Sequence, residues 1–498
     1  MKLKRNNVCD TCRTHKIGCD GKRPVCTQCQ MTRRKCEGYL LDRTFVPYAS
    51  KGAKGLSLKA VIAASNASLP TCPINNACML AKGFSKVEAQ RSPQFWPLKQ
   101  IHSATPDEFA AVIVSCFALK DQVNLSHSDL STSQVCGAWV GLVPRLVARA
   151  NSGELICLAA KAFGAAILDR NQGGTSAFRS KETYVAALRK LNGTLLARKS
   201  PFSLETAASI ACLAMAELIV PTSDDGIHAH NRGLSALLSL CPPELFSDGD
   251  LHFIFIGCRP PLLFDALRER KTTFLSQNVW LTVPFRRHLP TDIQKLIGDT
   301  AIIPSIMQDI DLLRTLPYDE ALSGAWKPRF AIQFILGKLH KWENRFKLDV
   351  AGPSSQFMQA CVLEHNPEGE SIFWFPNLMV ANIYTHTWAL QILCLAEMER
   401  LDAFFSGHDM ENRVLDGEPH EKNMLTKRKL AIKISQSMEY LLQDTMNLHG
   451  AAAALFPLEI AYNVLITDWA SNNKHIVRCE GFFDRIRRKG LSGRPSIC

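Results

Sequence analysis

CDTCRTHKIGCDGKRPVCTQCQMTRRKC, residues 9–36, is the stretch that decides the fold of the N-terminal part of this chain. Its spacing is C-x2-C-x6-C-x6-C-x2-C-x6-C, and its six cysteines are Cys9, Cys12, Cys19, Cys26, Cys29 and Cys36. The first three cysteines map onto the last three with an offset of 17 positions, and an acidic residue follows the third cysteine of each half (Asp20, Glu37). This pattern indicates an internal duplication of one small metal-binding unit.

Zinc is the metal that the spacing favours. Thiolate is a soft ligand, and an all-sulfur tetrahedral site suits Zn(II) or an iron–sulfur cluster. Three cysteines per half cannot complete a four-coordinate site, whereas six can serve two tetrahedral metals if two sulfurs bridge. By the internal symmetry we expect the bridges to be Cys9 and Cys26. The first metal would then take Cys9, Cys12, Cys19 and Cys26, and the second Cys9, Cys26, Cys29 and Cys36.

Three other interpretations of the cysteines are a disulfide knot, a metallothionein-like sink and an iron–sulfur site. A disulfide knot requires secretion, and the N-terminal sequence MKLKRNNVCD lacks the apolar region of a signal peptide. An iron–sulfur cluster does not explain the basic residues between the ligands.

Basic residues are concentrated around the cysteines. Residues 1–40 hold ten Lys and Arg against three acidic residues, a net charge of +7 out of +12 for the whole chain. Six thiolates and two Zn(II) ions together would leave about +5 on the folded module. Such a density of positive charge is typical of a protein that binds a polyanion.

Residues 9–39 resemble the DNA-binding domain of the fungal zinc binuclear cluster (Zn2Cys6) transcription factors. The resemblance rests on all six cysteines, Arg13, Lys16, the Cys19-Asp20 pair and the Arg23-Pro24 pair. It implies two zinc ions per chain, a short helix following each C-x-x-C, and double-stranded DNA as the partner. It also implies that the first helix reads base edges in the major groove, in this family a CGG-type triplet.

The resemblance assigns roles to individual basic residues. Arg13, His15 and Lys16 would enter the major groove, and Lys16 occupies the place of the family's main base-reading lysine, which suits guanine because O6 and N7 both accept hydrogen bonds. His15 and Gly18 stand where many members carry a basic residue. Arg33 is the symmetry mate of Lys16, but Gln30 stands at the place of Arg13, so the second half is expected to contact phosphate. The phosphate contacts expected are Lys4 and Arg5 in an N-terminal arm, Lys22 and Arg23 in the loop between the halves, and Arg33 and Arg34.

The length of 498 residues, with 46% hydrophobic and 21% charged residues, predicts two or three domains with a real core. We expect a DNA-binding domain over 1–40, a proline-containing linker over 41–104 and an all-α regulatory domain over 105–490. Thr105-Pro106-Asp107-Glu108 is a capping-box signature, and alternation at period two is nearly absent. Prolines at 242–243 and 260–261 predict breaks. Helices are expected from 105, from near Asn151, and over 179–198, 204–220, 226–240, 260–276, 291–314, 329–347, 379–401, 425–447, 451–470 and 475–489.

This predicted body loosely resembles the helical regulatory domain that follows the cluster in these factors, chiefly over residues 228–275. No catalytic motif is present, which predicts that the protein is not an enzyme. The pairs His228/His230 and Asp309/Asp311 fit a polar loop and a solvated helix better than metal sites. The aromatic residues at 373–375 and Trp388 fit a core better than a ligand cage, although a small-molecule effector would be sought there.

Twelve further cysteines lie singly in apolar segments and are expected to be reduced. No uninterrupted apolar run reaches the roughly 18 residues of a membrane span, so no membrane partner is expected. The nucleus is the expected location, with rival import signals at 2–5, 33–35 and 485–489; the last also fits a helix C-terminus whose dipole it compensates.

Several alternatives stay open at this point. No heptad repeat follows the cysteines, so dimerisation through this region is unsupported. A homodimer, a co-regulator and a small-molecule effector are three open alternatives for the partner. The resemblance suggests control of a metabolic gene cluster, of unknown sign. The alternative functions are a zinc-cluster scaffold that docks a protein or RNA without specific DNA recognition, and an enzyme with a DNA-targeting head.

Overall fold

The computed structural model contains two compact units, residues 1–78 and 79–498. The residues that the structure describes are 9–15, 17–20, 22, 26–32, 34, 36, 104–117, 137–170, 177–197, 202–348, 362–365, 371–406 and 417–492. The predicted linker therefore lies outside the described residues except for Ala104. The same holds for five of the predicted DNA contacts, namely Lys4, Arg5, Lys16, Arg23 and Arg33.

The N-terminal unit is built from two equivalent halves. Helices α1 (Asp10–Thr14) and α2 (Thr27–Met31) have the same length and are offset by the 17 positions of the sequence repeat. Just beyond each helix, the backbone N–H groups of Ile17 and Arg34 donate to the carbonyls of Cys12 and Cys29, both at 3.0 Å. The predicted duplication is thus confirmed in the backbone.

The prediction that a helix follows each C-x-x-C is wrong in its start. Each helix already includes the second cysteine of the motif. The first cysteine of each pair precedes its helix, and its sulfur accepts the backbone N–H of the residue three positions later. These bonds run from Cys12 N to Cys9 Sγ and from Cys29 N to Cys26 Sγ, both 3.3 Å long. The sulfur therefore satisfies an N–H group that lacks a partner within the first helical turn, in the manner of an N-cap side chain.

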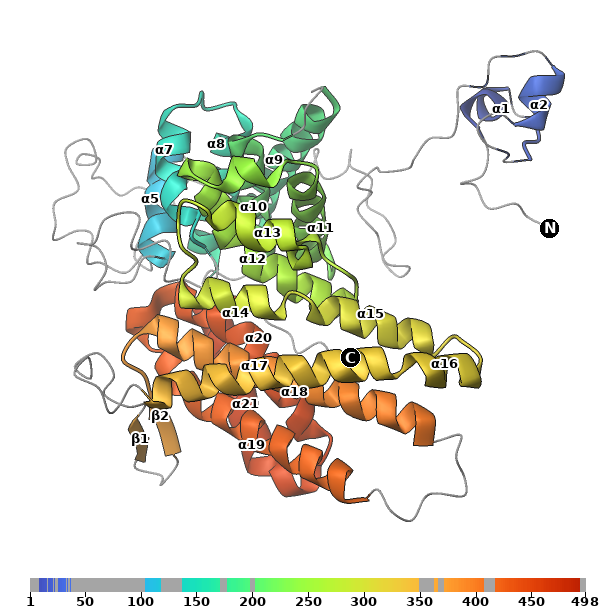
Figure 1. Ribbon diagram of the computed structural model, residues 1–498. Helices are drawn as coiled ribbons and strands as arrows, with labels where there is room; N and C mark the ends of the chain where they lie inside the picture. The colour runs from blue at the N-terminus through green and yellow to red at the C-terminus, as the bar shows by residue number, and fades with distance from the viewer. Residues whose placement is uncertain are drawn as a thin grey trace, which may run out of the picture. The chain divides into compact units, whose positions relative to one another are not determined.

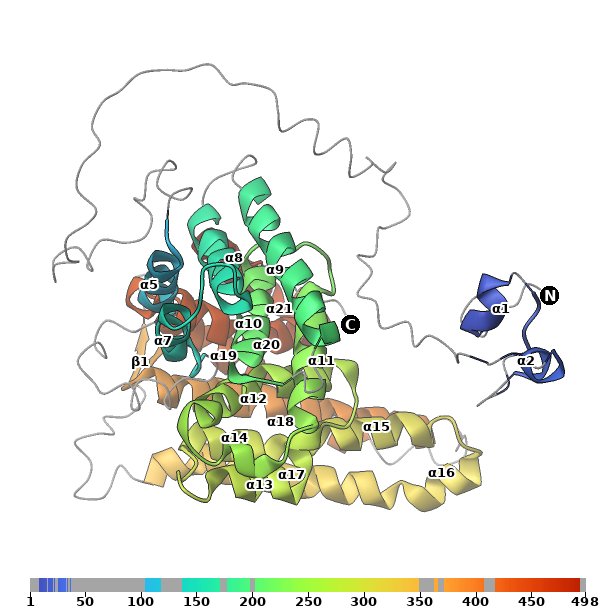
Figure 2. The same ribbon diagram turned by 90° about the horizontal axis from the view of Figure 1, so that it is seen from above.

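The first group of helices in the C-terminal unit packs around α8 and α10 (Figures 1 and 2). The predicted capping box is confirmed at α5, where Thr105 N donates to Glu108 Oε2 at 2.6 Å and Glu108 N donates to Thr105 Oγ1 at 3.3 Å. The elements are α5 (Pro106–Phe117), η6 (Val140–Leu142), α7 (Val143–Ala148), α8 (Leu155–Asp169), α9 (Ala177–Ala197), α10 (Leu204–Ile219), α11 (Gly226–Ser239), η7 (Pro243–Phe246), α12 (Gly249–Glu269), η8 (Phe274–Ser276), α13 (Asn278–Thr282) and η9 (Val283–Phe285).

The second group packs around α18 and α19, and α14 and α15 lie between the two groups, in contact with α12 on one side and with α17 and α18 on the other (Figure 1). One apolar core runs through both groups. From the two intervening helices to the end of the second group, the elements are α14 (Asp292–Thr300), α15 (Ile303–Leu313), α16 (Tyr318–Gly324), α17 (Trp326–Leu348), β1 (Val362–His365), β2 (Ser371–Trp374), α18 (Leu378–Ser406), α19 (Gly417–Leu441), η12 (Asp444–Met446), α20 (Asn447–Ile466) and α21 (Trp469–Lys489).

The prediction of an all-α body is wrong at one place, because β1 and β2 form an antiparallel hairpin with Val362 opposite Trp374 and His365 opposite Ser371. The hairpin rests on α19, and the Trp374 ring meets Tyr440 edge-on at 6.0 Å. Phe375 and Trp388 are buried, and Phe373 and Trp374 are partly buried and pack against the same core. They form part of the core, as predicted.

Several helix boundaries also differ from prediction. Helix α12 covers Gly249–Glu269 and not 260–276, and α19 covers Gly417–Leu441 and not 425–447. Helix α8 begins at Leu155 rather than near Asn151, since Asn151 and Glu154 form a turn before it. The predicted helix over 291–314 is divided into α14 and α15, the second of which has Pro304 in its first turn.

The prolines at 260 and 261 lie inside α12 instead of breaking it. Pro260 has no N–H, so it cannot donate to the carbonyl of Ile256 one turn earlier. The side chain of Gln294 on α14 supplies the missing donor at 2.9 Å. A tertiary hydrogen bond thus replaces the helical one that the proline removes.

Two helices are long and apolar enough by length and composition to cross a membrane, Leu378–Phe405 and Asp444–Ile466. In the first helix 83% of the most apolar 18-residue segment is buried inside the protein, and in the second helix 50%. Both helices pack in the core of the body. The first contains the buried polar residues Asn382 and His386.

Gly450 on α20 lies so close to neighbouring atoms that a larger side chain has no room there. A Cβ there would lie 2.1 Å from the carbonyl oxygen of Leu441 and 2.5 Å from Met446 Cβ. We expect Gly450→Ala to destabilise the body by roughly 1–3 kcal/mol, the usual cost of overpacking. Gly481→Ala on α21 is the matched control, since nothing lies within 4 Å of its added Cβ. It should stabilise by up to about 1 kcal/mol.

Chemical denaturation of the full chain, followed by helical circular dichroism, compares the two variants. A Gly450→Ala protein as stable as the Gly481→Ala protein would contradict the close contact between α20 and the end of α19.

Candidate metal centre and nucleic-acid interface

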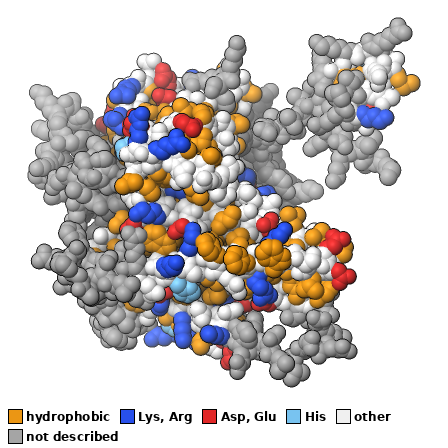
Figure 3. Space-filling model, in the orientation of Figure 1, with side chains coloured by type: hydrophobic (Ala, Val, Ile, Leu, Met, Phe, Trp, Pro, Cys, Tyr) orange, Lys and Arg blue, Asp and Glu red, His pale blue; other side chains and the backbone are white. Residues whose placement is uncertain are grey.

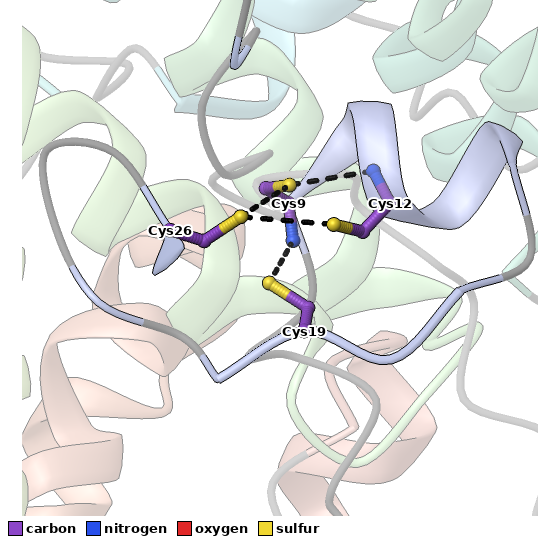
Figure 4. A group of neighbouring side chains, drawn as sticks. All are labelled: Cys9, Cys12, Cys19 and Cys26. Atoms are coloured by element: carbon purple, nitrogen blue, oxygen red, sulfur yellow. Dashed lines mark hydrogen bonds between the residues drawn. The ribbon is translucent and has the colours of Figure 1, made fainter. Parts of the chain in front are cut away.

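The six cysteines predicted as ligands come together in the N-terminal unit. Their sulfur atoms form two groups of four, each with all members within 4.8 Å of one another. The first group is Cys9, Cys12, Cys19 and Cys26, and Figure 4 shows its sulfur atoms turned toward one another. The second group is Cys9, Cys26, Cys29 and Cys36. Cys9 and Cys26 belong to both groups, which are the two sets expected from the symmetry of the sequence.

The separations of the sulfur atoms suit a shared metal and not a disulfide. Cys9 Sγ lies 3.6 Å from Cys26 Sγ and 3.7 Å from Cys29 Sγ, and Cys12 Sγ lies 3.6 Å from Cys26 Sγ. A disulfide bond is about 2.05 Å long. Two sulfurs bound to one tetrahedral zinc at ~2.3 Å lie about 3.8 Å apart. The cluster therefore has the spacing of zinc-binding sulfur atoms.

A bound cation would hold these buried sulfurs in the thiolate form. Burial raises the pKa of the Cys9 and Cys12 thiols and raises the pKa of Cys29 to about 12. Zinc, when bound, supplies the positive charge that keeps the sulfurs deprotonated. Backbone N–H groups of Cys12 and Cys29 point at the two shared sulfurs and stabilise negative charge there as well.

Asp20 joins the two halves of the module. Its carboxylate accepts the backbone N–H of Thr27, the first residue of α2, at 3.1 Å, and the Thr27 hydroxyl at 2.5 Å. The Thr27 hydroxyl, followed by its backbone N–H, lowers the pKa of the Asp20 carboxyl. An acidic residue that follows the third cysteine therefore fixes the start of the helix that carries Cys29. Sequence reasoning missed the partner Thr27; its signal is a hydroxyl residue directly after the fourth cysteine.

We expect Asp20→Ala to release zinc to a chelator several-fold faster than the unaltered chain, because Thr27, the first residue of α2, loses the acceptor of its N–H and hydroxyl groups. Asp20→Asn keeps an oxygen acceptor and should recover much of the loss. The rate of zinc transfer to a colorimetric chelator measures both variants. Identical rates for Asp20→Ala and the unaltered protein would show that the contact does not position α2.

Three of the predicted DNA contacts have described side chains, and all three are exposed: His15 after α1, Lys22 between the halves, and Arg34 after α2. Arg13 lies within α1, and its side chain is outside the described set. Helix α1 ends at Thr14, and Lys16 lies outside the described residues, so its role as a base reader stays a prediction.

The other candidate sites of the sequence have structural partners. His228 and His230 lie within α11 rather than in a loop and face different elements, with His228 bonded to Asp265 and His230 to Tyr184. Asp311 on α15 pairs with Arg270 and Arg400. Among the described residues, no group with metal-ligand geometry includes any of these.

Most basic side chains of the run at 485–489 form ion pairs within the body. Arg485 pairs with Glu439 at 2.5 Å, Lys489 with Asp444 at 2.8 Å, and Arg487 with Asp484. Gly490 ends α21 in the left-handed conformation at φ +98°. These contacts favour the helix-terminus interpretation over an import signal.

Seven of the twelve cysteines beyond the cluster lie among the described residues, and all seven are reduced thiols. Six are buried, and Cys241 is half-buried. Burial raises the pKa of Cys479 to about 11. These thiols have the environment of inert core side chains, as predicted.

Comparison with known proteins identifies the N-terminal module. Residues 7–43 match the family described as the fungal Zn(2)-Cys(6) binuclear cluster domain. Domains of this family bind zinc through their six cysteines, and here the six cysteines are grouped accordingly.

A 33-residue segment is 54% identical to part of the aspercryptin biosynthesis cluster-specific transcription regulator of Emericella nidulans. The matched segment covers 7% of this chain and 5% of that relative. No solved structure matches the chain at a comparable level of significance.

Proposed function

We propose that this protein is a zinc-dependent, sequence-specific DNA-binding regulator of RNA polymerase II transcription that acts in the nucleus. The observation that carries the proposal is the pair of overlapping four-sulfur groups in a strongly basic segment. The match to the Zn(2)-Cys(6) domain and the relative's description as a transcription regulator support it.

Two zinc ions would occupy the module, bridged by Cys9 and Cys26. Cys12 and Cys19 would complete the first site, and Cys29 and Cys36 the second. A module this short cannot bury enough apolar surface to fold alone, so zinc binding supplies the free energy of folding.

DNA recognition is assigned to the first half of the module. Arg13, His15 and Lys16 would enter the major groove over a CGG-type triplet, with Lys16 reading guanine. The exposed positions of His15, Lys22 and Arg34 are compatible with DNA contact. The phosphate contacts proposed are Lys4, Arg5, Lys22, Arg23, Arg33 and Arg34.

The helical body would regulate this activity. Three of its polar candidates, His228, His230 and Asp311, are engaged in hydrogen bonds and ion pairs within the body. Because the relative is named as a regulator of a biosynthesis cluster, we extend to this chain the control of a metabolic or secondary-metabolite gene cluster.

The test is DNA binding by the full chain, measured with zinc and after chelation over a series of salt concentrations. Binding should require zinc, and log K should fall with log salt by about 0.9 per phosphate contact. Binding that is insensitive to both zinc and salt, or absent, would favour the scaffold function instead.

A further inference from the structure

Helix α17 has two apolar faces, and one of them faces solvent. Ile332, Ile335 and Leu339 are buried in the core. On another face Trp326, Phe330 and Phe334 are 62%, 65% and 57% exposed. Their spacing of four residues sets them in one line along the helix. Figure 3 shows hydrophobic side chains gathered along this part of the surface.

The line extends beyond α17. Leu322 on α16 precedes Trp326 by the same interval and is half-exposed. Leu312 on α15 and Leu316, between α15 and α16, are exposed as well. At ~200 Å² for a whole aromatic side chain, the three rings alone expose on the order of 350 Å². A contiguous apolar patch of a few hundred Å² commonly marks an interaction site. We call Leu322, Trp326, Phe330 and Phe334 the aromatic face.

The two ends of the aromatic face carry opposite charge. Asp319 and Glu320 are exposed before its first residue, and His340 and Lys341 are exposed after its last. Phe330 lies midway between Glu320 and Lys341 in the sequence. Two other lysines lie closer to Phe330 in the sequence, and each has a partner within the body. Lys327 lies over the Trp326 ring at 5.9 Å, and Lys338 binds Asp299 at 2.8 Å.

We propose that the aromatic face binds a second copy of this chain, antiparallel, about a two-fold axis near Phe330. A two-fold axis brings the same surface of both copies together, so that surface must complement itself. Rings would then meet rings, and the acidic end of each copy would meet the basic end of the other. An opposite-charge pair at equal intervals from the centre is what such a pairing needs, whereas a different partner would not require it.

The area that a stable dimer interface needs determines which residues must lie inside it. A stable interface buries about 800 Å² per partner, which the three rings do not supply alone. The exposed leucines of α15 and α16 and the charged ends would therefore be inside the contact. This inference does not depend on DNA binding, because every residue that it uses lies in the body.

The first test is sedimentation velocity of the zinc-loaded full chain over a concentration series. We expect a dimer, and Phe330→Ala should raise its dissociation constant at least about 30-fold, as for a central aromatic anchor. Val477→Ala, an exposed apolar residue on α21, is the matched control and should leave the dimer intact. Circular dichroism checks that both variants remain folded.

The second test examines the register. Glu320→Lys and Lys341→Glu should each weaken the dimer several-fold, since each variant places like charges together at both ends. Mixing the two variants should restore association, because every contact in the mixed dimer again joins opposite charges.

A monomeric unaltered chain would overturn the proposal, as would a dimer that Phe330→Ala leaves unchanged. A mixture that associates no better than the separate charge variants would exclude the antiparallel pairing. Loss of DNA binding with the dimer retained would bear on the proposed function and not on this surface.

Discussion

Cys26→Ala should remove both zinc ions from the protein, whereas Cys12→Ala should remove chiefly one. Cys26 and Cys9 are the sulfur atoms common to both groups, so neither group keeps four ligands without them. Since zinc supplies the folding free energy of such modules, on the order of 10 kcal/mol or more, specific DNA binding should be lost as well. Metal analysis of the purified chain after gel filtration gives zinc per protein.

Cys212→Ala is the matched control, a buried cysteine in the body that lies in no sulfur group. It should retain both ions. Equal zinc loss across all six single cysteine variants of the module would contradict the assignment of Cys9 and Cys26 as bridges.

Lys16→Ala should weaken binding to the preferred site by roughly 1–3 kcal/mol, about 5- to 150-fold, and relax the preference for guanine. The reason is that a lysine directed at guanine O6 and N7 contributes to discrimination and not only to attraction. Affinity for the preferred site and for random DNA, measured at one salt concentration, separates these effects.

Arg33→Ala is the natural comparison, because Arg33 is equivalent to Lys16 in the 17-residue repeat. It should weaken binding to all DNA alike, as expected of a phosphate contact. A change in sequence preference caused by Arg33→Ala, together with uniform weakening by Lys16→Ala, would reverse the roles of the two halves.

The cysteine module was predictable to a large extent because its ligand geometry is local and repeated. The spacing and the offset of 17 were enough to predict both sulfur groups, including the shared pair. What the spacing did not contain was the overlap of each helix with its C-x-x-C, which depends on sulfur accepting a backbone N–H. Nor did it contain the Asp20–Thr27 contact, which joins the halves through space.

In the body, sequence signals within one helix predicted its structure well. Hydrogen bonds between different helices could not be predicted from the sequence. Thr105 and Glu108 form the capping box that the sequence indicates. The helix through Pro260 was not predictable, because its missing donor comes from Gln294 on another helix. The short strands β1 and β2 are stabilised by packing on α19 rather than by a long alternating pattern.

The aromatic face shows a further limit of pattern reasoning. Trp326, Phe330 and Phe334 have the spacing of a core-facing stripe, so periodicity alone predicts burial. Only the fold shows that another face of α17 takes that role and that these rings remain exposed.

The measurement that tests the central claim most directly is selection of bound sites from random DNA by the zinc-loaded full chain, with the Cys26→Ala protein in parallel. Enrichment of CGG-type triplets by the unaltered chain and none by Cys26→Ala is the predicted result. Two triplets at a fixed spacing would further indicate that DNA is bound by a dimer. Absence of enrichment with two zinc ions bound would contradict sequence-specific recognition and favour a scaffold.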